Sequence, residues 1–165
     1  MHFPNDTETF AADKTEHSFM VADSLKISPA LDSGVNMTLS YFPEGCWVNM
    51  KKYSEIICTA AGDGWKEINA TAGINIHLKP GGMVLHQPCL TMTGKKCMTT
   101  NDVRQFGKYN LVINRETKSF RSGHAQGKVF IDEDDSISKL DAAEYQYYEF
   151  FMSSNSLKKW NLNKK

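Results

Sequence analysis

Short stretches in which apolar and polar residues alternate are the feature that most restricts the fold of this chain. Residues 35–41 read Val-Asn-Met-Thr-Leu-Ser-Tyr, and residues 74–79 alternate in the same way. A period of two is typical of a β-strand with one buried and one wet face. We therefore expect Ser40 and His77 to lie on wet faces, with the apolar residues of both stretches in a core.

Turn residues separate further strand-like stretches. Residues 80–82 read Pro-Gly-Gly and interrupt the second alternating stretch, which resumes at residues 83–85. Residues 109–113 and 128–131 indicate two more strands joined by a long hairpin loop. Residues 145–152 are aromatic-rich and strand-like, although a buried helix also fits that length. Short strands with turns between them predict a mainly β fold, an antiparallel β-sandwich or barrel.

Length and charge exclude several classes of protein. With 165 residues the chain is too short for a complete (β/α)8 barrel. Its 19 Lys and Arg balance 19 Asp and Glu, so no net field attracts nucleic acid or an anionic membrane surface. No apolar run approaches the ~18–20 residues of a membrane span. Hydrophobic periodicity lapses from Thr91 to Asn101, where we expect a boundary between two small β units.

Cysteines and glycosylation motifs point towards the secretory pathway. Asn-x-Ser/Thr acceptor motifs begin at Asn5, Asn36 and Asn69. Four cysteines permit two disulfides with three connectivities, and four buried free thiols are the alternative. The N-terminus has no basic and apolar signal-peptide pattern, and a chain that is part of a longer precursor would reconcile these observations. The cysteines form two local sets, Cys46 with Cys58 and Cys89 with Cys97.

Candidate metal and catalytic motifs are incomplete. The acidic run at residues 132–135 has Ile137 and Ala143 where an EF-hand loop needs Gly and Glu, which leaves a looser calcium site or a solvated turn. Structural zinc sites favour closely spaced ligand pairs, and one such pair is a weak pattern. No nucleophile elbow or phosphate loop is present, so we expect no metal and no cofactor. The zinc candidates are His77, His86, Cys89 and Cys97.

Six short motifs follow one another along the chain. In sequence, spacing and order they resemble the C-terminal part of glycoside hydrolase family 31, the α-glucosidases of lysosomal and intestinal type. The resemblance continues more weakly from Tyr145 to Phe151, and it departs from the family pattern where Ala22-Asp23 stands in place of Gly-Asp. The motifs are Phe3 to Phe10, Ser18 to Leu31, Tyr41 to Trp47, Gly64 to Ile68, Ile74 to Gln87 and Gly127 to Ser136.

The resemblance implies an architecture. In this family a catalytic (β/α)8 barrel is followed by a proximal and then a distal β-sandwich domain. Residues 1–30 are then expected to be the segment that leaves the barrel. Residues 31–99 would form the proximal sandwich, and residues 100–165 a shortened distal β unit.

The resemblance also implies that this chain alone is not an enzyme. A retaining glycosidase needs two carboxyl groups about 5 Å apart. In this family both belong to the barrel, the nucleophile within a Trp-x-Asp-Met-Asn-Glu motif. None of Trp47, Trp65 and Trp160 begins that motif, so no catalytic residue is carried over. The implied role is to brace a catalytic barrel on another chain or segment, in a secretory, lysosomal or extracellular setting.

Two other functions fit the same residues. The chain would serve as a structural or interaction subunit of a larger assembly if it were a remnant that has lost its barrel. It would bind carbohydrate if Trp47 or Trp65 offered a stacking platform, although such tryptophans more often pack in cores. Aromatic residues near both ends, around Phe19 and Tyr147, favour a protein partner because an isolated chain would expose them.

Overall fold

The structure, a computed structural model, describes residues 18–71, 73–88, 97–99, 102–103, 107–116, 123–132, 145–154 and 156–161. Within these ranges the chain folds into β-strands, which confirms the expected mainly β class. No helix in the described ranges is long and apolar enough to cross a membrane.

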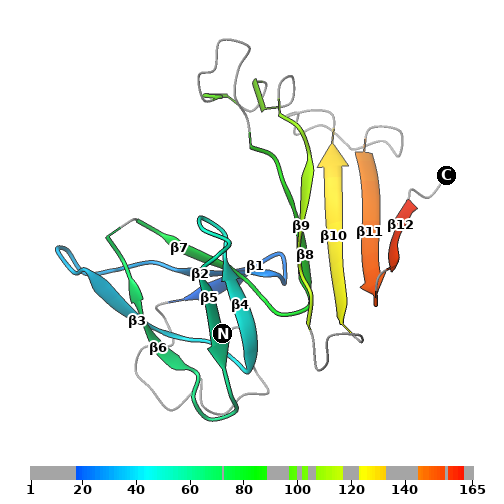
Figure 1. The fold of residues 1–165 in the computed structure, drawn as a ribbon. Helices are drawn as coiled ribbons and strands as arrows, with labels where there is room; N and C mark the ends of the chain where they lie inside the picture. Colours follow the sequence, from blue (N-terminus) through cyan, green and yellow to red (C-terminus); the bar gives the residue numbers. More distant parts are fainter. Residues whose placement is uncertain are drawn as a thin grey trace.

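The strands form two units that lie side by side (Figure 1). All the strands expected from the sequence are present, and residues 145–152 are a strand rather than a helix. The first unit holds β1 (Phe19–Val21), β2 (Leu25–Ser28), β3 (Met37–Tyr41), β4 (Gly45–Asn49), β5 (Ile56–Thr59), β6 (Trp65–Asn69) and β7 (Asn75–Leu78). The second unit holds β8 (Gly82–His86), β9 (Asn110–Asn114), β10 (His124–Asp132), β11 (Tyr145–Ser153) and β12 (Ser156–Asn161).

The first unit is a small β-sandwich. One layer is a five-stranded antiparallel sheet in the order β1-β2-β7-β4-β5, and the other is the antiparallel pair β3-β6. Phe42, Trp47 and Ile68 form the core between the layers, with Met20 and Ile57 packed against them. Burial of these side chains is the main stabilising contribution to the unit.

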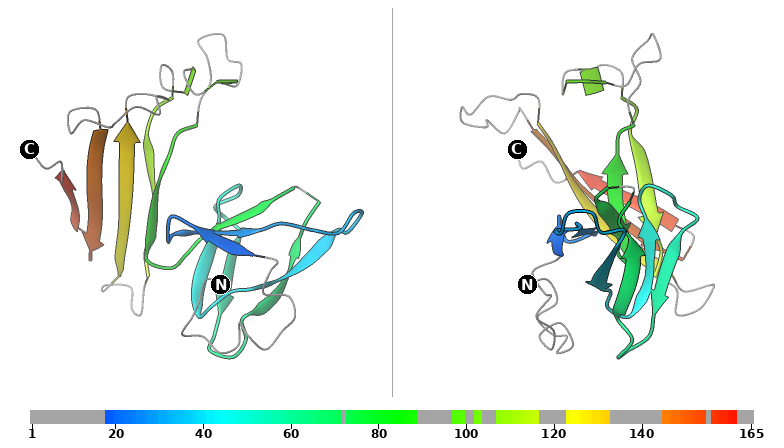
Figure 2. Two further views of the ribbon diagram at one scale, coloured as in Figure 1. Left: turned by 180° about the vertical axis from the view of Figure 1, so that it is seen from behind. Right: turned by 90° about the vertical axis from the view of Figure 1, so that its left-hand side faces the viewer.

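The second unit is one sheet in the order β12-β11-β10-β8-β9. The sequence predicted that residues 109–113 and 128–131 are hairpin neighbours, and this prediction is wrong because β8 lies between β9 and β10. The two strands meet only at the Glu116–His124 bridge among the described residues. Figure 2 shows β8 and β9 nearest the first unit and β12 farthest from it.

Residues 79–81 carry the chain from one unit to the other. The change of sheet therefore falls before the stretch Thr91 to Asn101, much of which lies outside the described residues. The domain limits 1–30, 31–99 and 100–165 remain a prediction. The connection packs tightly, since a Cβ atom added to Gly45 would lie 2.5 Å from Cγ of Pro80.

Asn114 fastens the two units together. Its side-chain Nδ2 donates hydrogen bonds to the carbonyl oxygens of Cys46 (2.8 Å) and Leu78 (3.0 Å), and the residue is only 9% exposed. On the exposed side of the junction, Tyr53 and His86 form a further contact of 3.2 Å between Oη and Nδ1. Asn114 therefore fixes how the second sheet stands on the first unit.

We expect Asn114→Leu to lower the free energy of unfolding by ~1–3 kcal/mol, because it leaves the buried carbonyl of Leu78 and the partly buried carbonyl of Cys46 without their donor. Urea denaturation measures the change. Asn110→Leu is the matched control, since Asn110 lies exposed at the other end of β9. Equal losses in the two variants would contradict a bridging role for Asn114.

The turn between β1 and β2 holds two residues with left-handed backbone conformation. The φ angles are 50° at Ala22 and 56° at Asp23, and Ser24 N donates to the Val21 carbonyl at 3.2 Å. Residues other than Gly adopt this conformation at a cost because Cβ crowds the backbone. The family pattern has Gly at the position of Ala22, and Gly adopts this backbone conformation without the steric cost.

Ala22→Gly is accordingly expected to raise the free energy of unfolding by up to about 1 kcal/mol. Thermal or urea unfolding of the single variant checks this. Ala60→Gly, at an exposed position without a positive φ, serves as the control and should not stabilise the protein. A destabilised Ala22→Gly variant would rule out strain at this turn.

Candidate docking face and inter-sheet cleft

The five-stranded sheet of the first unit carries apolar side chains on the face that points away from β3 and β6. Residues directly opposite each other in neighbouring strands share a face, and Ile27 lies opposite both Phe19 and Ile76. None of the ten strand positions on this face, which we call the outer face, is charged. They are Phe19, Val21, Leu25, Ile27, Cys46, Val48, Ile56, Cys58, Ile76 and Leu78.

Much of the outer face is open. Ile56 is 54% exposed, Phe19 44% and Val21 43%, whereas Leu78 is fully buried. Leu78 is covered because β8 approaches it so closely that a Cβ atom on Gly82 would lie 3.0 Å from its Cδ1. A sheet that is apolar on a solvent-facing side is typical of a layer that another structure covers.

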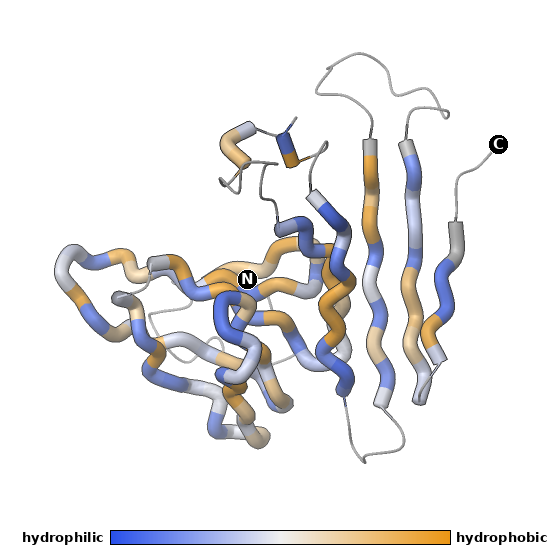
Figure 3. Tube along the Cα trace, turned by 45° about the horizontal axis from the view of Figure 1, so that its top comes forward, coloured by the Kyte–Doolittle hydropathy of each residue, from blue (hydrophilic) through white to orange (hydrophobic). Residues whose placement is uncertain are grey.

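The prediction that Ser40 and His77 lie on wet faces is wrong, although Tyr41 and Leu78 of the same stretches are buried as expected. Ser40 and His77 are each 2% exposed and lie in the core, whereas Met37 is 48% exposed and Ile74 54%. Figure 3 shows hydrophobic and hydrophilic residues alternating along these strands. Alternation identifies a strand but not which of its faces meets the core. Ser40 can face inward here because its hydroxyl bonds to Lys26 and Ser28.

A buried lysine lies at the centre of this polar cluster. Lys26 is 1% exposed, and its Nζ donates to Ser28 Oγ at 2.6 Å and to Ser40 Oγ. The two serine hydroxyls are 2.8 Å apart and bond to each other. Lys26 Nζ also lies 4.5 Å from the ring centroid of Phe42, a cation–π contact. Burial lowers the pKa of Lys26 to about 7.

His77 packs beside the same phenylalanine. Its ring meets Phe42 edge-on with centroids 5.0 Å apart, and its Nδ1 has no hydrogen-bond partner among the described residues. Burial, and secondly the charge of Lys26, lower the pKa of His77 to about 4. The sequence could have indicated this cluster, because Lys26 and Ser28 alternate with Leu25 and Ile27, but it does not say that the polar set faces inward.

These two groups make stability depend on pH. The unfolded chain binds more protons than the native state between pH 4 and 6.5 because of His77, and between pH 7 and 10.5 because of Lys26. Stability therefore rises with pH in both windows, by up to roughly 1 kcal/mol per pH unit.

The variant Lys26→Met should remove the rise above pH 7. It should also stabilise the protein at pH 7 by ~1–3 kcal/mol, since Ser28 and Ser40 still bond to each other. Urea denaturation at several pH values tests both expectations, with Lys66→Met as the control at a more exposed lysine. An unchanged slope above pH 7 in Lys26→Met would show that Lys26 is not the titrating group.

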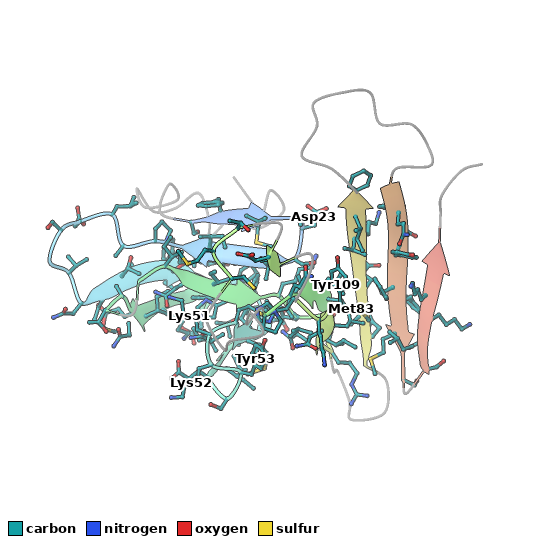
Figure 4. All side chains as sticks on the ribbon, turned by 90° about the horizontal axis from the view of Figure 1, so that it is seen from above. Asp23, Lys51, Lys52, Tyr53, Met83 and Tyr109 are labelled. Atoms are coloured by element: carbon teal, nitrogen blue, oxygen red, sulfur yellow. A yellow bond between two sulfur atoms is a disulfide. The ribbon has the colours of Figure 1, made fainter. Side chains whose placement is uncertain are left out.

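A cleft of about 1170 Å3 separates the two units. The turn residues Ala22 and Asp23 lie on its first-unit wall, and Figure 4 shows Asp23 at the end of that unit facing the second sheet. Residues of β10 and β11 form the other wall. There Lys128 Nζ lies 3.4 Å from Glu149 Oε1 across the strands.

Two predicted glycan acceptors lie close together on the surface. Asn36 and Asn69 are exposed at the same end of the β3-β6 pair, where Ala70 N donates to the Asn36 carbonyl at 2.8 Å. Asn69 Oδ1 accepts hydrogen bonds from N (2.8 Å) and Oγ1 (2.6 Å) of Thr71. Asn5 lies outside the described residues, and glycosylation remains a prediction at all three.

The structure pairs Cys46 with Cys58 across β4 and β5. Cys97 is also disulfide-bonded, and Cys89 lies outside the described residues. The zinc candidates are not brought together, because His77 is buried in the first unit while His86 is exposed at the end of β8. Among the residues that the structure describes, no His, Cys, Asp and Glu side chains gather in a group that would hold a metal.

The tryptophans proposed as sugar platforms do not serve as such. Trp47 is 2% exposed in the core, with its Nε1 donating to the Pro43 carbonyl at 2.9 Å. Trp65 is half-buried and packs edge-on against Tyr41, with ring centroids 5.3 Å apart. The exposed aromatic residues of the cleft are instead phenylalanines, among them Phe130.

Comparison with known proteins places these features in a family. Residues 1–84 match the family model for the glycosyl hydrolase family 31 C-terminal domain. The chain is 27% identical to an alpha-glucosidase of Hordeum vulgare, with 81% of this chain and 14% of the relative covered. It is 25% identical to the lysosomal alpha-glucosidase of Bos taurus, with 94% and 16% covered.

Solved structures share the fold. A family 31 dextranase of Flavobacterium johnsoniae, in a complex with glucose, superimposes with a TM-score of 0.63 at 17% identity. The match covers 93% of this chain and 17% of the dextranase. This chain thus spans about one sixth of the length of the proteins it resembles.

Two joined units of β-sheet, the first with an uncharged outer face, make up the described part of the chain. Since the family model matches half of the sequence, the chain belongs to glycoside hydrolase family 31, in the region of its C-terminal domain.

Proposed function

We propose that this chain is the non-catalytic C-terminal β portion of a family 31 α-glucosidase-like protein. It braces a catalytic barrel, carried by another chain or segment, that hydrolyses terminal α-linked glucose. The observation that carries the proposal is the outer face, on which all ten strand positions are uncharged and all except Leu78 remain for a partner to cover. The relatives support it, because each has about five sixths of its length outside the matched region.

The outer face suits a permanent contact. Burial of apolar surface contributes roughly 25 cal/mol per Å2, and a charged side chain at the centre would oppose it. Leu78 on this face is already covered by the second unit, so a partner would extend an existing contact across Val48 and Ile76. All ten positions fall within the residues that match the family model.

Catalysis is assigned to the partner. Neither a nucleophile motif nor a recognisable acid/base pair is present in the sequence, and retaining glycosidases need both carboxyl groups. The contribution of this chain is positional, because small displacements of a catalytic group cost large factors in rate.

The purified chain should therefore leave maltose unhydrolysed, and it should bind a polypeptide that carries the Trp-x-Asp-Met-Asn-Glu motif. Glucose release and mass spectrometry of the isolated complex measure the two outcomes. Val21→Lys and Ile56→Lys should abolish the complex, since each buries a charge in an apolar contact. Glu67→Lys, exposed on β6 away from the outer face, is the control. Glucose release by the isolated chain would contradict the proposal.

A second function is a barrel-less remnant that acts as a structural or interaction subunit. The strained Ala22, at a place where the family pattern has Gly, favours it as a sign of relaxed constraint. The identity of the bound polypeptide separates the two functions, because a remnant would bind one without the nucleophile motif. The Cys46–Cys58 disulfide fits an oxidising compartment and so favours the first function.

A further inference from the structure

Aromatic and ionic side chains alternate along the sheet wall of the inter-sheet cleft. Cross-strand partners share a face, and the β10 and β11 residues that line the cleft include three pairs on one face of the sheet. Phe130 is 49% exposed and Phe151 36%, so both rings are accessible. The three pairs on this wall are Gln126 with Phe151, Lys128 with Glu149, and Phe130 with Tyr147.

The spacing of these pairs is regular. Phe151 and Tyr147 are four residues apart on β11, which separates the aromatic ends of the wall by about 14 Å. Between them lies the Lys128–Glu149 ion pair, and the Tyr147 hydroxyl donates to Glu149 Oε1 at 3.3 Å. The wall therefore offers an apolar platform at each end and polar groups in the middle.

We propose that this cleft binds a short linear oligosaccharide. Its sugar rings stack on the aromatic side chains at the two ends, and its hydroxyl groups bond to Lys128 and Glu149 between them. A pyranose ring has an apolar C–H face and a rim of hydroxyl groups. A chain of such rings therefore presents apolar faces and hydroxyl groups that match the alternating aromatic and ionic side chains of the wall. Binding sites of this kind combine aromatic surface with a few well-placed polar groups.

The opposite wall suits the same ligand. Asp23 and Glu44 are exposed there, and their carboxylates accept hydrogen bonds from hydroxyl groups. A volume of about 1170 Å3 admits several sugar rings. The junction fastened by Asn114 holds the two walls in place, which lowers the cost of ordering the cleft on binding.

A bound peptide strand is less favourable. Such a strand needs a free sheet edge with unpaired backbone groups. β10 is paired with both β8 and β11, and β11 is paired with both β10 and β12. The wall therefore recognises its ligand through side chains, as stacking sugars require.

The inference that the ligand is built from α-linked glucose rests on the proposed function. The inference that the cleft binds an oligosaccharide does not. The full chain is titrated with maltotriose, isomaltotriose and the β-linked cellotriose by calorimetry and ligand-observed NMR. We expect saturable binding of an α-linked trisaccharide. Phe130→Ala and Phe151→Ala should each weaken it about tenfold. Phe19→Ala, exposed on the outer face, should leave it unchanged.

Each result decides between the proposals. Binding of cellotriose alone would support an oligosaccharide cleft and count against the α-glucosidase role. Absence of saturable binding by all three sugars would overturn the cleft proposal and leave the bracing role untouched. Equal affinities of the parent chain and of both phenylalanine variants would also overturn the cleft proposal. Circular dichroism spectra that match the parent protein establish that the variants are folded.

Discussion

The structure depends on one constraint, which is that the five-stranded sheet of the first unit does not turn a polar face towards the solvent. Its inner face packs on β3 and β6, and its outer face carries no charged strand position. Sheets that are buried on both sides are usually central layers of larger structures. The polar groups that an isolated sandwich would turn outward, such as Lys26 and His77, lie inside it instead.

Around Lys26 that inversion is stabilised because the buried polar groups bond to one another, whereas His77 Nδ1 has no hydrogen-bond partner among the described residues. Lys26 bonds to two hydroxyls that also bond to each other, and its charge faces the ring of Phe42. Desolvation nevertheless favours the neutral amine, which is why its pKa falls to about 7. The buried cluster thus leaves the outer face free to be apolar, at some expense of stability near and below neutral pH.

The sequence predicted six of the twelve strands in the described ranges, but not which way they face, and it missed β1, β2, β4, β5, β6 and β12. Periodicity in residues 35–41 and 74–79 is unambiguous, yet the assignment of Ser40 and His77 to a wet face assumed that polar residues point to water. Sheet order was equally hidden, because the insertion of β8 between β9 and β10 depends on contacts distant in sequence. The sequence pointed to the aromatic residues around Tyr147 and to the motif that contains Phe130, but it did not show that these two side chains share one face of a sheet beside a cleft.

The two proposed surfaces occupy different parts of the chain and do not compete. The outer face belongs to β1, β2, β4, β5 and β7, while the aromatic wall belongs to β10 and β11. The segment 79–81 and the Asn114 side chain join the two units, so a partner on the outer face would also influence the direction in which the cleft opens. Taken together, the two proposals describe a module that would hold a saccharide chain at a set position relative to the partner that it braces. The hydrogen bonds from Asn114 to Cys46 and Leu78 join the unit that carries the outer face to the unit that carries the aromatic wall, so any coupling of the two proposed surfaces would pass through this junction.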